Sequence, residues 1–385
     1  MRRPRSPILL VGNYQIDHQH SMLKYATMLY ETLLKELVDV HLVKPKVVFG
    51  RLDPKNKWLG YLDKLILFRW QLRKEVLKIE SSRKACCVVH VCDHSNSPLF
   101  KAVARQKKIL TCHDLIAIRS AQGEFSGQLP RYSGRTLQAI IKKTIPLAKH
   151  IACVSKATES DLHALLPTTK GKTSVVHNGF NAAYKRQPDE ILVDRLSNLK
   201  ITPKSDVLLH VGSNAWYKNR MGVLKIFKRY KSQATKPNAI LVLAGPELDA
   251  EQYDYAKKNG LTPNVQCTGP LSHAQLEALY CISSALIFPS RYEGFGWPPL
   301  EAQRCGCPVI ASSNGSLNEV IGDSAPTSEW DDTKSHVEAL KNVLLDEHYR
   351  QKFVDRGFEN VKRFSAQKMA EHFSKIYCAL ETHTK

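Results

Sequence analysis

Short apolar runs alternate with longer amphipathic stretches along the whole chain. In the first half, runs at 8–11, 88–91, 109–112 and 151–154 are separated by stretches with helical periodicity, among them 21–37, 61–79 and 136–149. After residue 200 the alternation restarts, with runs at 207–211, 239–244, 265–268, 285–288 and 308–311. Uniformly apolar runs are typical of strands buried on both faces, and their alternation with helices is typical of parallel sheets. The pattern therefore predicts two doubly wound α/β domains.

The two series are separated by a polar stretch between Asn181 and Ile201, which contains Pro188 and many charges. We expect an N-terminal Rossmann-like domain over 1–185, a C-terminal Rossmann-like domain over 200–365 and a final helix over 366–385. In doubly wound sheets, ligands bind beyond the carboxyl ends of the strands. The residues that directly follow each apolar run are therefore the candidates for a site, with an interdomain cleft as its expected location.

Composition narrows the class of protein. Of 385 residues, 43% are hydrophobic and 24% charged, which is an ordinary globular balance and excludes a disordered or fibrous chain. No apolar stretch approaches the roughly 18 residues that a membrane-spanning helix needs. The ten cysteines include no CxxC pair and no metal-ligand spacing. In a chain of this length they indicate reduced thiols and a cytoplasmic location.

The positive charge is concentrated in the first half of the chain. The formal net charge is +20; residues 1–190 hold 32 Lys/Arg and 15 Asp/Glu, whereas residues 191–385 hold 24 and 21. This asymmetry predicts that the N-terminal half meets an anionic partner, such as a membrane or a phosphorylated acceptor. Nucleic acid is not expected, because the sequence contains no recognition module for it.

The densest motif is PSRYEGFGWPPLEA at residues 289–302, directly after an apolar run. Gly294 and Gly296 permit close backbone approach to a ligand, and the two prolines suit the first turn of a helix. The N-terminus of such a helix attracts anions. Glu293 and Glu301, with seven residues between them, supply carboxylates that accept hydrogen bonds from sugar hydroxyls. The segment is suited to holding a diphosphate between two sugar-like groups.

This segment resembles the Glu-x7-Glu signature of retaining glycosyltransferases of family 4, which have the GT-B fold. The following segment at 305–312 and the Gly315-Ser316 turn continue the family's pattern. The sequence from Gly294 to Glu301 is similar to that of mannosyltransferases and related enzymes of polysaccharide synthesis. The resemblance implies two facing Rossmann-like domains, with the last helix crossing back to the N-terminal domain.

The resemblance also assigns roles to residues of the C-terminal half. It implies that Glu301 binds the ribose and Glu293 the donor sugar, while Lys218 and the backbone of Phe295 and Gly296 hold the diphosphate. The remaining donor-site residues are Gly12, Ser213, Asn219, Gly269, Pro270, Leu271 and Gly294. Many relatives carry Arg where this chain has Ser213, and Arg220 and Arg291 are the candidates to replace that charge.

In the N-terminal half, the resemblance places His113 near the donor sugar and the reacting centre, together with Glu293 and Lys218 as catalytic residues. Family members often have a Gly-Gly pair after the first strand, whereas this chain has only Gly12. Tyr14, Asp17 and His20 in the following loop are weaker acceptor candidates. The absence of G-x-G-x-x-G removes support for an NAD site.

No Asp-x-Asp pair and no His/Cys ligand cluster occurs in the sequence, so we expect no cofactor and no bound metal. Lysine and a helix N-terminus would then stabilise the leaving diphosphate.

The basic segment 61–84 has two interpretations. It is either a helix that lies on an anionic membrane or an ordinary helix packed on the N-terminal sheet. On a helical wheel Arg69 and Arg73 fall inside the apolar arc, which favours the ordinary helix.

The expected function is transfer of a hexose, mannose or similar, from a GDP- or UDP-linked donor to a hydroxyl of a glycan or lipid-linked acceptor. The anomeric configuration would be retained. Location would be cytoplasmic, with peripheral contact to the cytoplasmic membrane face. Two alternatives stay open: a nucleotide-sugar epimerase of GT-B fold, and a catalytically silent relative, which the Ser213 departure would explain.

Overall fold

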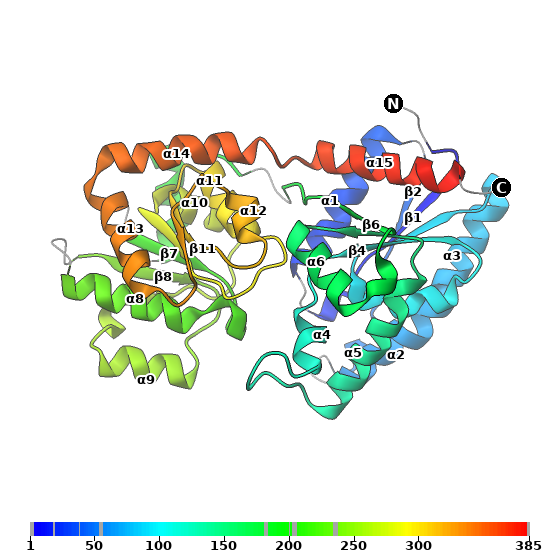
Figure 1. Ribbon diagram of the computed structural model, residues 1–385, viewed down its shortest axis with the longest axis horizontal. Coiled ribbons are helices and arrows are strands. Elements are labelled where there is room, and N and C mark those ends of the chain that lie inside the picture. The colour runs from blue at the N-terminus through cyan, green and yellow to red at the C-terminus, as the bar shows by residue number, and fades with distance from the viewer. Residues whose placement is uncertain are drawn as a thin grey trace. The chain divides into compact units, whose positions relative to one another are not determined.

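In the computed structural model, the described residues are 4–17, 20–37, 39–53, 57–180, 184–199, 201, 206–233 and 238–382. The chain divides into two units, which are coloured from blue to red along the sequence in Figure 1. Unit 1 contains residues 1–181 and 365–385, and unit 2 contains residues 182–364. Residues 181–183 and 200 of the predicted break lie outside the described residues. Each unit has its own six-stranded sheet.

The sheet of unit 1 has the order β2-β1-β3-β4-β5-β6, and all its strand pairs are parallel. The chain leaves β1 for β2 on one side and returns to β3 on the other. The loops after β1 and β3 therefore diverge at a topological switch point, where doubly wound sheets bind ligands. The strands are β1 (Ile8–Val11), β2 (Val40–Val43), β3 (Val88–Val91), β4 (Lys107–Cys112), β5 (His150–Cys153) and β6 (Thr173–Val175).

Several helices of unit 1 bury one face against this sheet. Phe68, Leu72 and Val76 of one helix share a core cluster with Leu9 and Val89 of the strands. At the far end of the chain, α15 packs against α1, and Figure 1 shows the red and blue helices side by side. The α-helices are α1 (His20–Glu36), α2 (Lys57–Leu62), α3 (Phe68–Arg83), α4 (Ile116–Ala121), α5 (Tyr132–Thr144), α6 (Lys156–Leu165) and α15 (Ala366–Thr382).

The sheet of unit 2 has the order β12-β11-β10-β7-β8-β9 and is also parallel. Here the chain runs from β7 to β9 on one side and resumes with β10 on the other side of β7. The switch point therefore lies between β7 and β10, and the loops after these two strands meet the same edge. The strands are β7 (Val207–Val211), β8 (Ile240–Ala244), β9 (Val265–Cys267), β10 (Ala285–Phe288), β11 (Val309–Ser312) and β12 (Thr327–Ser328).

Helices cover both faces of the second sheet. Along β10, Leu286 and Phe288 belong to one core cluster, whereas Ala285 and Ile287 belong to the other, because successive side chains point to opposite faces. The helices are α7 (Asp189–Leu196), α8 (Arg220–Gln233), α9 (Ala250–Lys258), α10 (His273–Ile282), α11 (Trp297–Arg304), α12 (Leu317–Ile321), α13 (Thr333–Leu345) and α14 (Glu347–Val361). Two sheets of this kind confirm the predicted parallel α/β class.

Two features differ from the pattern read along the sequence. Strands β2, β6 and β12 are not predicted by apolar runs; β2 and β6 are only partly buried and β12 is two residues long. The segment 61–79 is not one α-helix, because a π-helical turn, η3 (Asp63–Leu67), separates α2 from α3. Wheel positions counted across this turn at 3.6 residues per turn are therefore wrong, including those that placed Arg69 and Arg73.

Candidate functional site

Lys218 and Glu293 form an ion pair at the switch point of unit 2. The Lys218 Nζ atom lies 2.8 Å from Oε1 and 3.0 Å from Oε2 of Glu293. Lys218 ends the short 3-10 helix η8 (Trp216–Lys218) after β7, and Glu293 lies in the loop after β10. The Lys218 ammonium also lies 5.4 Å from the centre of the Phe288 ring. Glu293 is only 7% exposed, so this cation is held in a poorly solvated position beside its carboxylate.

Asn219 holds the Lys218 loop in place. It adopts a left-handed backbone conformation with φ of 54°, and its side-chain amide donates to the carbonyl oxygens of Pro289 at 2.8 Å and Trp330 at 3.1 Å. In the other direction, the Arg291 backbone N–H donates to the Tyr217 carbonyl oxygen at 2.7 Å. These bonds tie the loops after β7 and β10 to each other. Asn219 thus supports the loop through its own contacts to the protein.

The backbone of Glu293 is clamped from the opposite side by the turn at Gly315 and Ser316. The Ser316 hydroxyl donates to the carbonyl oxygens of Glu293 at 3.0 Å and Phe295 at 2.9 Å. Gly315 has a φ of +62°, and a Cβ atom there would lie 2.9 Å from the Glu293 carbonyl oxygen. Only glycine fits this approach without displacing the Glu293 backbone.

Gly296 is the N-cap of helix α11, which follows the loop of Glu293. Its φ is +98°, and a Cβ atom would come within 2.7 Å of the Leu317 side chain. Pro298 and Pro299 have no N–H group, so the donors at this helix start come from the loop residues and Trp297. The start of α11 and the ammonium of Lys218 belong to the same two loops, and both favour an anion.

Glu301 is held by a tyrosine that no sequence motif indicates. Its Oε2 accepts a hydrogen bond from the Tyr280 hydroxyl at 2.9 Å, and Glu301 is 5% exposed. Burial raises the pKa of Tyr280 well above its usual value, and the nearby Glu301 charge adds to this, so the phenol keeps its proton and stays a donor. The contact helps to orient the carboxylate.

Ser213 and the two candidate arginines occupy different surroundings. The Ser213 hydroxyl accepts from the Ala215 backbone N–H at 3.3 Å. Arg220 is 2% exposed and donates to the side chain of Asn214 and to the Pro246 carbonyl oxygen at 2.9 Å. Its guanidinium therefore joins the loops after β7 and β8. Arg291 stacks on Trp330, with its guanidinium carbon 4.2 Å from the ring centre.

The remaining predicted donor residues of unit 2 lie in the loop after β9. The Gly269 N–H donates to the Gly245 carbonyl oxygen at 2.9 Å, and Gly269 has a φ of +66° with open space where a Cβ atom would stand. Pro270 is exposed, whereas Leu271 packs against the core cluster beneath the sheet. Part of the Leu271 side chain is therefore buried against the core of unit 2.

In unit 1, His113 follows β4 and is 4% exposed. Its Nε2 lies 2.9 Å from the Cys92 carbonyl oxygen. A carbonyl oxygen only accepts, so the hydrogen is on Nε2 and Nδ1 is the acceptor atom of the neutral ring. Burial lowers the pKa of His113, and the Asp93 charge partly opposes this. The Tyr25 ring stands edge-on to the imidazole, with the ring centres 4.6 Å apart.

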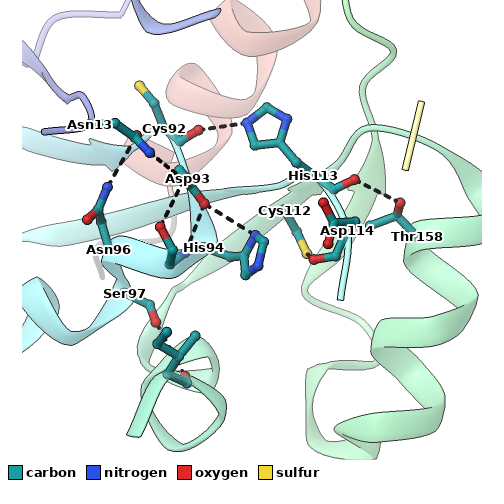
Figure 2. A network of polar contacts seen from close by, with 12 residues as sticks. Asn13, Cys92, Asp93, His94, Asn96, Ser97, Cys112, His113, Asp114 and Thr158 are labelled. Carbon is teal, nitrogen blue, oxygen red and sulfur yellow. Dashed lines mark hydrogen bonds and ion pairs between the residues drawn. The ribbon is translucent and has the colours of Figure 1, made fainter. Parts of the chain in front are cut away.

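Asp93 is the centre of a buried polar network at the switch point of unit 1. Figure 2 shows contacts from Asn13 and His94 converging on its carboxylate, with His113 bonded to the neighbouring Cys92 carbonyl. Ser95 donates to Asp93 through its backbone N–H at 2.9 Å and its hydroxyl at 2.8 Å. Burial alone would raise the pKa of Asp93, but His94, His113 and the Asn13 amide hold it below the usual value.

Asn13 and Asp93 each follow an apolar run, so the sequence makes both of them candidates for a site but does not show that they meet. Asn13 and Asp93 follow β1 and β3, which are neighbours in the sheet, and that adjacency was the signal. The order of the strands had to be known before this signal could be used, because 80 residues separate the two side chains.

The N-terminal loop candidates have structural contacts of their own. Tyr14 is 1% exposed and donates its hydroxyl hydrogen to Asp63 Oδ2 at 2.6 Å. Asp17 forms an ion pair with Lys64. A Cβ atom on Gly12 would lie 3.1 Å from the Lys44 side chain. His20 begins α1, and its side chain lies outside the described residues.

The described residues lack two features, a metal-ligand group and a membrane-spanning helix. They contain no group of three or more His, Cys, Asp or Glu side chains that could hold a metal ion. They also contain no helix that is both long and apolar enough to cross a membrane.

Two family models match the chain in sequence order. Residues 24–184 match the Glycosyltransferase Family 4 domain, and residues 196–360 match the domain of Glycosyl transferases group 1. The first model lies in unit 1 except for its last residues, and the second lies within unit 2.

Similar proteins include two O-antigen chain mannosyltransferases. The O-antigen chain mannosyltransferase B of Escherichia coli is 24% identical over 68% of this chain and 67% of its own length. The O-antigen chain mannosyltransferase RfbU of Salmonella typhimurium is 28% identical over 60% of this chain and 62% of its own length. The matched part of the chain thus spans about two thirds of these relatives or less.

Solved structures show the same fold at low identity. A sucrose-phosphate synthase from Thermosynechococcus elongatus has a TM-score of 0.73 and 18% identity, with 98% of this chain and 100% of that chain covered. Anabaena Alr3699/HepE in complex with UDP and glucose has a TM-score of 0.72 and 14% identity, covering 97% and 100%. With two Rossmann-like units, a family 4 domain followed by a group 1 domain and these relatives, the chain belongs to the glycosyltransferases of GT-B fold.

Proposed function

We propose that this glycosyltransferase moves a hexose, mannose or similar, from a GDP- or UDP-linked donor to a hydroxyl of a glycan or lipid-linked acceptor, with retained anomeric configuration. The observation that carries the proposal is the Lys218–Glu293 pair beside the start of α11. It combines a cation, a helix N-terminus and a sugar-binding carboxylate within two adjoining loops. The mannosyltransferase relatives support the sugar, and the UDP named in the HepE structure supports a nucleotide donor.

The donor would be held by unit 2. Lys218 and the backbone around Phe295 and Gly296 would take the diphosphate, and the Glu301 carboxylate, which Tyr280 orients, would accept from the ribose hydroxyls. Glu293 would bind the sugar hydroxyls. As the diphosphate enters, Lys218 would exchange part of its contact with Glu293 for phosphate oxygens, which leaves that carboxylate available to the sugar.

The chemistry would be same-face substitution at the anomeric carbon. The bond to the diphosphate oxygen breaks through an oxocarbenium-like state, the acceptor hydroxyl oxygen forms the new bond, and the departing phosphate oxygen takes its proton. Lys218 and the α11 start would stabilise the negative charge that develops on the leaving group, a role that needs no metal ion. His113, as a neutral ring with an acceptor nitrogen, would contact the donor sugar.

The acceptor would be bound by unit 1. The first 190 residues hold most of the excess positive charge, which supports an anionic acceptor such as a lipid-diphosphate-linked glycan. A cytoplasmic location is supported by the ten cysteines, none of which forms a disulfide bond in the described residues.

The experiment is a thermal-shift panel of UDP, GDP, ADP and their sugars. Glu301→Ala should abolish the shift caused by the matching nucleotide, whereas Glu293→Ala should keep the nucleotide shift and lose the increment from the sugar. Glu251→Ala, at an exposed position on α9, is the matched control and should keep both. No shift with any nucleotide sugar would contradict the proposal and favour a catalytically silent relative.

Product analysis then tests the reaction. The anomeric signal of the product in an NMR spectrum reports retention or inversion, and activity in the presence of EDTA reports any metal requirement. Release of free sugar and nucleotide without transfer in the presence of acceptor would favour the epimerase alternative.

A further inference from the structure

Unit 1 exposes a row of large apolar side chains along the helical segment 57–83. Its members are Trp58 (69% exposed), Leu62 (38%), Ile66 (53%), Trp70 (63%) and Leu77 (63%), here called the outer stripe. Single exposed apolar residues are common, but two tryptophans and three aliphatics in one row are not ordinary solvent-facing surface.

The row lies on one side because of the π-turn. The first four members are four residues apart, and η3 has more residues per turn than an α-helix, so this spacing stays on one face through Asp63–Leu67. The opposite side of α3 carries Phe68, Leu72, Val76 and Ile79, which are buried in the core of unit 1. The outer stripe therefore lies on the side away from the sheet, where the exposed Arg73 and Lys74 stand between Trp70 and Leu77.

A neighbouring loop extends this surface. Val48, Phe49 and Leu52 around the 3-10 helix η2 (Phe49–Arg51) are 48%, 37% and 77% exposed. The backbone N–H groups of Val48 and Phe49 donate to the buried Asp63 carboxylate at 3.0 Å each. Asp63 thus fastens this loop to the π-turn and fixes its apolar side chains beside the outer stripe.

Positive charge surrounds the apolar residues. A hollow between the loop and α3 is lined by apolar residues and by two lysines and two acids: Val48, Leu67, Phe68, Trp70, Gln71, Lys46, Lys74, Asp63 and Glu75. The Asp63 carboxylate is already occupied by the loop backbone, which leaves Glu75 opposite the two ammonium groups. Residues 57–84 contain eight Lys/Arg and three Asp/Glu, and of these acids Asp63 is buried. A surface of tryptophan, leucine and lysine matches the chemistry of an anionic lipid surface, where indole rings lie at the headgroup level and lysine meets lipid phosphate.

We propose that the outer stripe and the Val48–Leu52 loop dock unit 1 on an anionic phospholipid bilayer. The helical segment lies in the headgroup plane, with Trp58 and Trp70 inserted and Lys46 and Lys74 on lipid phosphates. The surface belongs to unit 1 alone, so this inference does not depend on the donor chemistry proposed for unit 2. Within the basic N-terminal half, these residues make the contact with the bilayer.

The test is co-sedimentation of the full chain with vesicles at low salt. We expect binding to mixed phosphatidylcholine–phosphatidylglycerol vesicles and much weaker binding to phosphatidylcholine alone, with affinity falling as salt is raised. The double variant Trp58→Ser/Trp70→Ser should lose roughly tenfold or more in affinity. Lys46→Glu/Lys74→Glu should remove the preference for anionic vesicles.

Two controls separate loss of docking from other effects of the substitutions. Tyr253→Ser/Leu345→Ser removes two exposed apolar side chains from unit 2 and should bind vesicles as the wild type does. Both double-serine variants should keep the melting temperature of the wild type without any ligand, which separates loss of docking from loss of folding.

Three results would overturn the proposal. These are equal binding to neutral and anionic vesicles, no binding to either, and vesicle binding that survives the loss of both tryptophans. Self-association of the wild type that disappears in Trp58→Ser/Trp70→Ser, measured by sedimentation velocity without lipid, would instead assign the surface to a second copy of the chain.

Discussion

The Tyr377 hydroxyl lies 2.7 Å from Nδ1 of His90, although 287 residues separate them in the sequence. The other ring nitrogen of His90 lies 2.8 Å from the Thr111 hydroxyl, so the buried imidazole is bonded at both nitrogens. Tyr377 belongs to α15 and His90 to β3. One polar chain therefore joins the last helix to the middle of the first sheet.

Removal of this hydroxyl should weaken unit 1. Tyr377→Phe deletes one bond and leaves a ring nitrogen of His90 buried without a partner, which is expected to lower the free energy of unfolding by about 1–3 kcal/mol. Denaturant unfolding followed by circular dichroism measures the change. Tyr132→Phe, at a residue on α5 that is 82% exposed, is the control and should be neutral. Equal stability of the two variants would refute the role given to this bond.

Stability should fall in mild acid because of His90. Burial, with smaller contributions from His113 and His150, lowers the pKa of His90 to about 3. The unfolded histidine titrates near 6.5, so between these values the unfolded state binds the proton and the folded state does not. The contribution of His90 is thus lost as pH falls below about 6.5, by roughly 2 kcal/mol at pH 5. The variant His90→Gln should show a shallower loss between pH 7 and 5, and an unchanged slope would contradict this.

The charge on Lys218 should contribute to the affinity for the diphosphate and not to the affinity for the base. Lys218→Met removes the cation and leaves the Glu293 carboxylate buried without it, so a bound diphosphate is repelled. We expect nucleoside diphosphate affinity to drop by about 1.5–3 kcal/mol while nucleoside affinity stays within a factor of a few. Isothermal titration measures both. Lys225→Met, at an exposed position on α8, should bind like the wild type.

The turn at Gly315 offers a test of how firmly Glu293 must be held. Gly315→Ala places a Cβ atom 2.9 Å from the Glu293 carbonyl oxygen, whereas Gly260→Ala has the same left-handed backbone, φ of +64° against +62°, and open space around it. Both should cost about 1 kcal/mol of stability through backbone strain. Only Gly315→Ala should also reduce the thermal-shift increment from the donor sugar. A similar loss in both variants would mean that strain alone is responsible.

The local signals in the sequence determined the elements and the class of fold. Runs such as 8–11 and 285–288 are apolar throughout because helices cover both faces of a parallel strand. Such strands can therefore be recognised from their own residues, without knowledge of the strands that they pair with. Strands β6 and β12 gave no such signal because they are short and partly exposed. The motif at 289–302 carries its own glycines, prolines and carboxylates, so its loop-and-helix form and the family resemblance could be predicted from consecutive residues.

Tertiary structure alone decided which distant side chains meet. Lys218 and Glu293 are 75 residues apart, and they pair because the order of strands sets β7 beside β10. Tyr280 reaches Glu301 because α10 packs on α11, and nothing near Tyr280 in sequence distinguishes it from a core tyrosine. The outer stripe depended on a π-turn, which changes the helical angle of every later residue. These contacts cannot be predicted from the spacing or the type of the residues. They arise because elements that pack together in space are not consecutive in the chain.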